Sequence, residues 1–459
     1  MGIGGMGLSA IAKVLLERGY VVSGSDLQSS AITRDLTHLG ATIYEGHRPK
    51  QIGQADLVVV SSAVSSDNVE VLEATRKDIP VIKRAEMLGR LMASHYGIAV
   101  AGTHGKTTTT AMIAFILEEA GFDPTFIVGG ILRDLGTNAK AGRGPHFVVE
   151  ADEYDRTFLG LSPSLAVVTS IEMDHPDCYK DLKEMTDAFA QFLNLVPQDG
   201  CIIGWGDGET VRELKESRTA KRPPFATYGF GSDNDWRAVD VATRPEGGND
   251  FTVLRSGAAV ADVRLNLPGR HNVANALASL AAMDWLGINL PLAAQILGRF
   301  RGTERRFEIK GTVGGVTVID DYAHHPTEIR ATLAAVRERF PGREIWAVFQ
   351  PHTYSRTKAL LDDFAASLGQ ADHVIVTDIF PAREHDDLGV SAADIVSRMD
   401  HPDTRYIAGF DEALAYLGHN LRPTQVLVTL GAGDIYQLGE RLATTQTSGR
   451  EVKGGKERP

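Results

Sequence analysis

Short apolar runs alternate with amphipathic stretches over the first part of the chain. The pattern predicts strands at residues 20–22, 57–60 and 81–82. Helical periodicity covers residues 8–18 and 69–76 between them. This alternation is typical of βαβ units that build a parallel sheet. It predicts an α/β domain over residues 1–94.

A second alternation of the same kind begins after residue 94. The strand-like run 98–101 leads through a Gly/Thr loop into an apolar helical stretch at 111–119, which Gly121 ends. Further elements are predicted as strands at 147–150 and 166–170, a helix at 182–195, and a hairpin or exposed loop at 244–250 within a more polar region. We assign residues 95–300 to a central domain with a mostly parallel sheet.

A third alternation follows the basic cluster that begins at Arg299. It predicts strands at 316–319, 345–349, 373–377 and 426–430, and helices at 326–339 and 358–368. These elements define a C-terminal Rossmann-like domain over residues 301–443. Residues 444–459 are polar, glycine-containing and charged, so they predict a disordered tail. The expected fold class is therefore α/β in three domains.

Composition narrows the classes of function. A net charge of -12 on 459 residues argues against general binding of nucleic acid, because the chain would repel a polyphosphate at long range. The two cysteines, Cys178 and Cys201, are too few for a disulfide framework and favour a reducing compartment, which makes the cytoplasm the expected location. The Ala- and Leu-rich stretch 275–297 is interrupted by polar residues and proline, so we expect two buried helices and no membrane span.

The strongest chemical motif lies between the strand 98–101 and the following helix. It comprises Gly102, Thr103, His104, Gly105, Lys106, Thr107 and Thr108. In such a loop, backbone N–H groups converge on phosphate oxygens, the Lys106 ammonium adds positive charge, and the Thr107 hydroxyl can bind Mg²⁺. The spacing departs from the usual phosphate-loop motif, because Val100 stands where the first glycine should fall. We expect a nucleoside triphosphate to bind here.

Phosphoryl transfer also requires a metal opposite the loop, and ligands in open α/β sheets lie at the carboxyl ends of strands. Glu150 ends the strand 147–150, and Asp174 and His175 follow the strand 166–170. A carboxylate suits Mg²⁺, which prefers oxygen, so His175 is the weaker metal ligand. Either group could instead be a solvated loop charge.

The N-terminus carries a glycine pattern typical of phosphate-binding turns. Gly2, Gly4 and Gly7 fall in the register of a dinucleotide fingerprint, and Asp26 follows at the expected distance. The strand that should feed this turn is absent, because the chain begins at Met1, so we expect a Rossmann-like domain without its first strand. The residues alone leave open whether a dinucleotide or another diphosphate binds, or whether the turn is only structural.

Several polar clusters remain near the third alternation. Arg299, Arg301, Arg305 and Arg306 form a basic cluster at a domain junction, where an arginine can neutralise a transferring phosphate. Adjacent His324 and His325 open a helix; we favour substrate or nucleotide contact over zinc, because no third ligand lies nearby in the sequence. Residues 350–357 and 431–434 follow two other strands and predict an anion or amino-acid site.

These motifs together resemble one family, the Mur ligases of bacterial cell-wall synthesis. The segments that carry the resemblance are 2–7, 24–26, 102–108, 150–153, 174–175, 269–272, 305–307, 321–326, 350–357 and 431–434. The resemblance implies an N-terminal domain for a UDP-sugar, a central ATPase and a closing C-terminal domain. It further implies ATP- and Mg²⁺-dependent ligation of L-alanine to UDP-N-acetylmuramate through an acyl-phosphate. The expected protein is a monomer or weak homodimer that contacts neither nucleic acid nor membrane.

The resemblance also assigns roles to individual residues. By the family pattern, Lys106 binds the γ-phosphate, Thr107 and Glu150 hold one Mg²⁺, and His175 touches a second metal. The remaining expected contacts are His271, Asn272, Arg306 and Asp321 with the nucleotide, Tyr322, His324 and Arg356 with the amino-acid side, and Gly4, Gly5, Gly7 and Asp26 with the UDP-substrate.

Two departures from the family pattern keep alternatives open. Several relatives bridge the metals with a carbamylated lysine after the Asp-His pair, yet residues 186–195 contain no lysine. Tyr154, where many alanine ligases have serine, is shared with the ligase that attaches a recycled tripeptide. That ligase is the alternative within the family. A nicotinamide-dependent oxidoreductase and a nucleotide-switched binding module are the alternatives from other classes.

Overall fold

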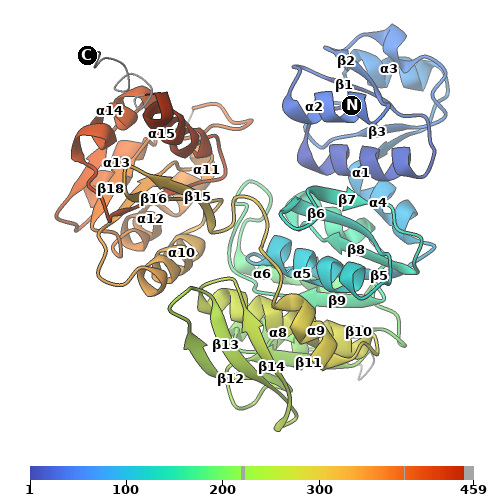
Figure 1. Cartoon of the computed structure of the whole chain (residues 1–459). Coiled ribbons are helices and arrows are strands. Elements are labelled where there is room, and N and C mark those ends of the chain that lie inside the picture. Colours follow the sequence, from blue (N-terminus) through green and yellow to red (C-terminus); the bar gives the residue numbers. More distant parts are fainter. Residues whose placement is uncertain (219–222, 387, 449–459) are drawn as a thin grey trace, which may run out of the picture.

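The computed structural model describes residues 1–218, 223–386 and 388–448. Figure 1 shows three α/β domains, with the central domain below the N-terminal and C-terminal ones in this view. Contacts of α1 with β6 and β7, and of α10 with α8, join the outer domains to the central domain. The α/β class and the three successive sheet-containing domains agree with the sequence prediction.

The N-terminal domain contains two separate two-stranded parallel sheets, β1–β2 and β3–β4. Its elements in chain order are α1 (Met6–Glu17), β1 (Ser23–Asp26), α2 (Ala31–His38), β2 (Thr42–Glu45), η1 (Pro49–Ile52), β3 (Val58–Val60), α3 (Val69–Arg76), β4 (Val81–Lys83) and α4 (Arg84–Met92). The strand predicted at residues 20–22 is wrong. Tyr20 and Val21 are exposed, and the strand begins at Ser23, which is the first residue paired with strand β2, opposite Thr42.

A cavity of about 880 Å³ separates the two small sheets. Its walls include residues 20–25, next to β1, and residues 55–59, next to β3. Met1 bridges the gap, because its amino group donates to the Val59 carbonyl while the Gly2 N–H donates to the Ser25 carbonyl. Met1 therefore lines the cavity between the two sheets.

The central domain is built on a ten-stranded sheet in the order β14-β13-β12-β11-β10-β9-β5-β8-β6-β7. Its strands are β5 (Tyr96–Ala101), β6 (Thr125–Leu132), β7 (Thr137–Lys140), β8 (His146–Glu150), β9 (Leu165–Val168), β10 (Cys201–Trp205), β11 (Phe225–Gly229), β12 (Trp236–Thr243), β13 (Asn249–Arg255) and β14 (Ala258–Leu265). Seven neighbouring strands run parallel, and antiparallel pairs close both edges. The predicted hairpin at 244–250 is confirmed as the β12–β13 turn.

The helices of the central domain pack on this sheet. They are α5 (Lys106–Glu119), η2 (Tyr154–Gly160), α6 (Leu182–Leu193), α7 (Glu209–Glu216), α8 (Arg270–Trp285) and α9 (Leu290–Leu297). Helices α5 and α8 contact each other and are buried on nearly all sides, which explains why neither shows a clear division into an apolar and a polar face. The predicted pair of buried helices in 275–297 is confirmed. Among the described residues, no helix is long and apolar enough to cross a membrane.

The C-terminal domain has a six-stranded sheet in the order β15-β16-β20-β17-β18-β19. Its elements are β15 (Glu308–Val313), β16 (Val316–Asp321), α10 (Pro326–Arg339), β17 (Ile345–Phe349), α11 (Tyr354–Ala359), α12 (Leu361–Ser367), β18 (His373–Val376), α13 (Ala392–Arg398), β19 (Thr404–Tyr406), α14 (Phe410–Asn420), β20 (Val426–Leu430) and α15 (Tyr436–Ser448). Every residue of β16, β17 and β20 is buried, as expected for a parallel sheet covered on both faces.

Two details of this domain differ from the predicted elements. The helix predicted at 358–368 is two helices, because Leu360 leaves helical geometry between α11 and α12. Helix α15 continues to Ser448, past the predicted start of the tail at residue 444. Residues 449–459 of that predicted tail lie outside the described residues.

Candidate functional site

The phosphate loop connects the central strand β5 to the buried helix α5. Gly102 has a φ of +128°, and a Cβ there would lie 2.1 Å from Thr169 Oγ1, so only glycine fits. Gly105 also has positive φ, at +80°. The Thr103 N–H donates to the Ser170 carbonyl over 2.6 Å, which ties the loop to the segment after β9. The loop is thus held open at the N-terminus of α5, where backbone N–H groups favour an anion.

Lys106 points back into the loop. Its ammonium donates to the carbonyls of Gly102 (2.6 Å) and Thr103 (3.1 Å) and pairs with Glu153 at 2.8 Å. Burial acts to lower the pKa of Lys106, but the charges of Glu153 and its acidic neighbours outweigh it and raise the pKa. Lys106 therefore carries its positive charge at the position expected for contact with a phosphate.

A cavity of about 430 Å³ lies between the central and C-terminal domains, next to the loop. Its size falls within the usual range of small-molecule sites. It is lined by His104, Gly105 and Thr108 of the phosphate loop and by the predicted nucleotide contacts His271, Asn272, Arg306 and Asp321. The fold therefore brings together seven residues that the sequence assigned to ATP from four separate segments.

Buried hydrogen bonds fix Asn272 and Asp321 in the wall of the cavity, and the Asn272 side-chain amide donates to the Pro268 carbonyl at 2.7 Å. Asp321 accepts from the backbone N–H groups of Phe307 (2.7 Å) and Ala323 (2.8 Å), and burial raises its pKa to about 6 although Arg306 acts to lower it. Burial lowers the pKa of His271 to about 4, so its imidazole is neutral near pH 7. These groups form the wall of the cavity. Arg306 is the positively charged side chain that the C-terminal domain contributes to it.

One wall of the cavity was not predicted from the sequence. Trp205, Tyr228 and Phe230 form an aromatic group on β10 and β11, with the Trp205 ring 5.3 Å from Tyr228 and 5.7 Å from Phe230. The guanidinium of Arg270 stacks over Phe230 at 3.9 Å. The sequence signal was weak, because these aromatics belong to none of the recognised motifs. They give the cavity an apolar face suited to a planar base.

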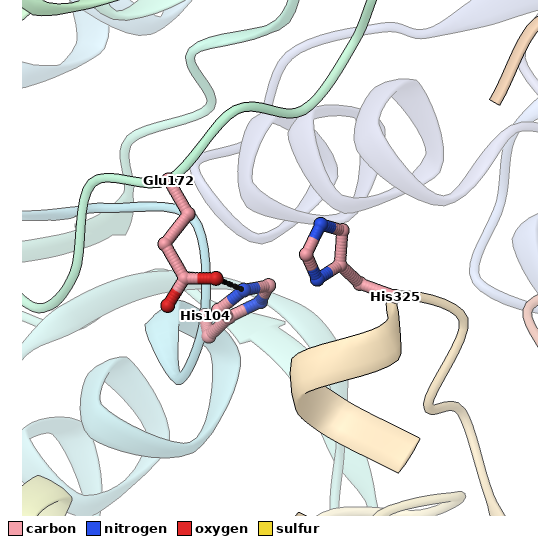
Figure 2. A group of neighbouring side chains, drawn as sticks. All are labelled: His104, Glu172 and His325. Atoms are coloured by element: carbon pink, nitrogen blue, oxygen red, sulfur yellow. Dashed lines mark hydrogen bonds and ion pairs between the residues drawn. The ribbon is translucent and has the colours of Figure 1, made fainter. Parts of the chain in front are cut away.

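Figure 2 shows a cluster at the domain boundary formed by His104, Glu172 and His325. Their donor atoms lie within 4.8 Å of one another, an arrangement that can hold a cation. The sequence found no third ligand for the adjacent histidines 324 and 325, because the other members come from the phosphate loop and the segment after β9. In this structure His104 contacts Glu172 at 3.4 Å and Glu328 at 3.3 Å, whereas the buried Nε2 of His325 has no hydrogen-bond partner among the described residues.

This cluster attaches the two domains to each other. Thr327, at the start of α10, donates to Glu172 over 2.7 Å. Burial acts to lower the pKa of His104, but hydrogen bonds to Glu172 and Glu328 and the charges of both carboxylates outweigh it and raise the pKa to about 9. A protonated His104 between two carboxylates therefore joins the phosphate loop to the C-terminal domain.

The predicted metal residues flank the loop on its other side. Thr107 is buried in the first turn of α5. Glu150, at the end of β8, accepts from the Gly129 N–H at 2.8 Å; a Cβ at Gly129 would lie 2.5 Å from this carboxylate, so glycine leaves room for it. His175 adopts a left-handed conformation (φ +54°), and its Nε2 lies 3.8 Å from Glu153. Glu153, which the sequence did not single out, thus lies between Lys106 and His175.

The predicted amino-acid residues lie on the C-terminal side of the same region. Tyr322 and His324 are in edge contact at 5.3 Å, and His324 faces His352 at 6.0 Å. Burial lowers the pKa of His324 to about 3 and that of His352 to about 4. Arg356 forks onto a carboxylate, as predicted, but the carboxylate is Asp174 of the central domain.

The predicted UDP-substrate residues form a turn in the N-terminal domain, away from this cavity. Gly4 donates its backbone N–H to the Asp26 carboxylate at 2.8 Å. A Cβ at Gly4 would lie 2.9 Å from the same oxygen, and one at Gly7 would lie 2.6 Å from Arg84. Gly5 caps helix α1. The three glycines and Asp26 therefore lie close together, as the fingerprint requires. The Asp26 carboxylate already accepts the hydrogen bond from Gly4.

The fold and these sites define a three-domain, phosphate-loop α/β protein. Its three parts match descriptions of one family: residues 1–96 match the Mur ligase family catalytic domain, 100–283 the Mur ligase middle domain, and 305–433 the Mur ligase glutamate ligase domain. The chain belongs to the Mur ligase family.

Curated relatives resemble the chain over nearly its whole length. A UDP-N-acetylmuramate--L-alanine ligase of Geobacter sp. (strain M21) is 46% identical, covering 98% of each chain. One of Salinibacter ruber is 47% identical, covering 96% of this chain and 93% of the relative. Among solved structures, the UDP-N-acetylmuramate-alanine ligase of Thermotoga maritima is 29% identical with a TM-score of 0.83, covering 98% of both chains. A murein peptide ligase of Psychrobacter arcticus is 26% identical with a TM-score of 0.72, covering 97% of both.

Proposed function

We propose that the chain ligates L-alanine to UDP-N-acetylmuramate with hydrolysis of ATP, in the synthesis of peptidoglycan precursors. The observation that carries this proposal is the cavity where the phosphate loop of the central domain meets Arg306 and Asp321 of the C-terminal domain. The near-full-length likeness to alanine ligases supports the choice of substrates. Ligases of this family use ATP, which agrees with the loop.

Each of the three domains has its own proposed binding role. We propose that residues 1–94 bind the UDP-substrate through Gly4, Gly5, Gly7 and Asp26, that residues 95–300 bind ATP, and that residues 301–443 bind the amino acid and close over the nucleotide. The turn around Gly4 leaves room for a close approach of phosphate to backbone, which supports the first assignment.

For the nucleotide, we propose that the loop N–H groups and Lys106 bind the phosphates and that Arg306 neutralises the transferring group. The aromatic group of Trp205, Tyr228 and Phe230 offers a stacking surface for the base, beside His271 and Asn272. When a phosphate binds, the Lys106 ammonium either leaves Glu153 or contacts Glu153 and the phosphate at the same time. The positive charge is then in place before the transition state forms.

We further propose that Mg²⁺ accompanies ATP, with Thr107 and Glu150 holding one ion and His175 contacting a second. The donor chemistry fits, because a hydroxyl and a carboxylate are ligands that Mg²⁺ prefers. A buried carboxylate oxygen of Glu153 without a hydrogen-bond partner, among the described residues, supports a cation nearby. Bound Mg²⁺ would offset charge on the phosphates during transfer.

The reaction follows in two steps. The lactyl carboxylate of the UDP-substrate attacks the γ-phosphorus of ATP, ADP leaves, and an acyl-phosphate forms while Lys106 stabilises the developing charge. The amine of L-alanine then attacks the acyl carbon, and the tetrahedral intermediate expels phosphate to leave the amide. Closure between the domains excludes water that would otherwise hydrolyse the acyl-phosphate.

On the amine side we propose roles for Tyr322, His324 and Arg356. With its pKa lowered by burial, His324 stays neutral near pH 7 and can accept a hydrogen bond from the incoming amine. Arg356 would bind the alanine carboxylate by exchanging or sharing its present partner Asp174. We place the reaction in the cytoplasm, where both cysteines stay reduced, and expect a monomer or weak homodimer that binds neither nucleic acid nor membrane.

The tripeptide-recycling ligase is the second candidate, because Tyr154 and the likeness to a murein peptide ligase favour it. The two candidates differ in the amine that they accept. ADP release is measured with ATP, UDP-N-acetylmuramate and either L-alanine or the tripeptide. We expect L-alanine to support release, and activity confined to the tripeptide would reject the proposal in favour of the second candidate.

A further inference from the structure

Arg383 of the C-terminal domain and Tyr154 of the central domain meet at the domain boundary, and neither residue lines the nucleotide cavity. The Arg383 guanidinium lies over the Tyr154 ring, 4.3 Å from its centre. Arg383 also pairs with Asp177 at 3.6 Å, and the Tyr154 hydroxyl donates to the same carboxylate at 3.0 Å. Three side chains from two domains therefore form one contact, in which the cation faces the negative side of the ring.

The backbone on each side of the boundary positions this contact. Arg383 follows Ala382, whose φ of +52° is unusual for a residue with a side chain. The next residue, Glu384, accepts from the Ser355 N–H at 2.9 Å. Because backbone strain persists only where the surroundings impose it, this turn fixes the backbone from which Arg383 extends. On the other side, Tyr154 begins η2, in the turn that follows β8.

Within the C-terminal domain, the turn of Arg383 is attached to the segment that holds Arg356, the proposed partner of the alanine carboxylate. Arg356 Nη1 lies 3.2 Å from His352 Nδ1, and the His352 ring stacks on the Phe380 ring at 5.6 Å. The Phe380 carbonyl accepts from the Thr353 N–H at 2.9 Å. Arg383 follows Phe380 by three positions, so it lies on the amine side of the site.

The central domain gives a second connection between the same two arginines. Asp174 accepts from Arg356, and the ring of the next residue, His175, lies 5.1 Å from the Tyr154 ring. Exposure rises along this path, because the side chain of Arg356 is 5% exposed and that of Arg383 is 53% exposed. The contact between Arg383 and Tyr154 therefore lies between the buried Arg356 and the solvent.

We infer that Arg383, Tyr154 and Asp177 form a gate that covers the amine side of the site and restricts the acceptor to a free amino acid. This inference rests on the proposed function, in which Arg356 binds the carboxylate of L-alanine. A group attached to that carboxylate extends outward from Arg356, toward the position that the gate occupies. An acceptor lengthened at its carboxyl end, such as an L-alanyl peptide, meets the gate, whereas L-alanine fits behind it.

The gate can be removed without loss of the fold. Arg383 and Asp177 are both partly exposed, and exposed ion pairs contribute little to stability. Arg405 of β19 provides a matched control, because it lies over a tyrosine ring, that of Tyr416, at 5.0 Å and pairs with Asp403 at 3.6 Å. Its side chain is 52% exposed, so loss of this contact costs the fold about as much as loss of the gate.

The test measures acceptor selectivity. The full-length chain is incubated with ATP, Mg²⁺, UDP-N-acetylmuramate and either L-alanine or L-alanyl-glycine. Release of ADP gives kcat/KM for each acceptor, and mass spectrometry identifies the products. We expect wild type to prefer L-alanine, and Arg383→Ala to raise the ratio of dipeptide to L-alanine by about tenfold or more, the scale on which pocket size separates substrates. Tyr154→Ala should raise the same ratio, whereas Arg405→Ala should leave it unchanged.

Tyr154→Phe is the conservative variant. It keeps the ring beneath Arg383, so it should keep a ratio close to that of wild type. The double variant Arg383→Ala/Tyr154→Ala should not exceed the larger single effect, because both changes remove the same contact.

Three results would overturn the inference: an unchanged ratio in either alanine variant, equal use of both acceptors by wild type, or weaker use of L-alanine by Arg383→Ala with no gain for the dipeptide. The last result would make Arg383 a carboxylate-binding residue. Failure of wild type to use L-alanine at all would reject the proposed function as well. A wild type that makes the L-alanine product while the variants keep its ratio confines the failure to the gate.

Discussion

Arg356 of the C-terminal domain and Asp174 of the central domain form a buried ion pair. The Nε and Nη2 atoms of Arg356 both lie 2.9 Å from Asp174 Oδ1. Burial acts to raise the pKa of Asp174, but the Arg356 charge outweighs it and holds the pKa well below its usual range. The pair links the segment after β9 to helix α11, so it contributes to the attachment of the C-terminal domain.

Asp174→Asn should loosen this attachment. Removing one partner leaves a buried guanidinium without its counter-charge, which costs about 3–5 kcal/mol in buried pairs. We expect a lower melting temperature and a larger radius of gyration by small-angle X-ray scattering. Asp362→Asn, which breaks an exposed ion pair with Arg398, is the matched control and should change the stability by less than about 1 kcal/mol. Equal effects of the two variants would contradict this assignment.

The His104 cluster predicts a pH dependence of stability. The folded-state pKa of about 9 lies above the ordinary histidine pKa of about 6.5, so the contribution of His104 is fully present below pH 6.5 and is lost as the pH rises through 9. The difference in melting temperature between wild type and His104→Gln should therefore shrink over this window. The exposed His38 offers the control His38→Gln. A difference that stayed constant or grew from pH 6.5 to 9 would reject the ion-pair account.

The cavity between β1 and β3 predicts that an added strand stabilises the N-terminal domain. Both walls present strand edges, and Val21 is an apolar side chain at full exposure. An alternating apolar segment of about six residues, fused ahead of Met1, is long enough to run between the two sheets. Because about 1 kcal/mol shifts the melting temperature of a domain this size by roughly 4–8 °C, a rise of several degrees is expected.

A Gly/Ser segment of the same length is the control for that fusion, because it adds chain without strand propensity. We also expect the alternating segment to tighten binding of UDP-N-acetylmuramate, since it would support the turn around Gly4. Equal melting temperatures and equal affinities for the two fusions would mean that the cavity does not accept a strand.

Lys106→Ala should remove most of the ATP-dependent activity while the chain stays folded. Loss of a charge aimed at the transferring phosphate lowers turnover by about 10²–10³-fold in comparable sites. Lys183→Ala, at an exposed lysine paired with Asp187 on α6, should retain full turnover. Phosphate release that depends on UDP-N-acetylmuramate is the measurement, with the circular dichroism melt as a check of folding. Unchanged turnover of Lys106→Ala would remove the phosphate loop from the mechanism.

The sequence predicted those parts of the site that depend on local pattern. The phosphate loop was recognisable because a strand, two glycines and a helix follow one another within a few residues. The buried strands β17 and β20 and helix α10 were predicted with the bounds that the structure has, because the strands are short and mostly apolar and prolines 326 and 341 delimit the helix. The family resemblance supplied the order of the domains.

Contacts between distant segments could not be read from the sequence. Asp174 and Arg356 are 182 positions apart, and only the docking of two domains makes them neighbours. His104 and Glu328 are 224 positions apart, and the same docking of domains brings them together. The aromatic wall at Trp205 and Phe230 was missed because its strands contain polar and small residues among the aromatics. Glu153 was overlooked because the run from Glu150 to Asp155 offers four acidic residues, and only packing decides which one is buried.

Product formation tests the central claim most directly. The chain is incubated with ATP, L-alanine and UDP-N-acetylmuramate carrying ¹⁸O in the lactyl carboxylate, with the tripeptide and other amino acids in parallel, and products are identified by mass spectrometry. The account predicts UDP-N-acetylmuramoyl-L-alanine and ¹⁸O in the released phosphate, because the carboxylate oxygen leaves with the phosphoryl group. Phosphate without ¹⁸O, or an amide product with the tripeptide but none with L-alanine, would contradict it.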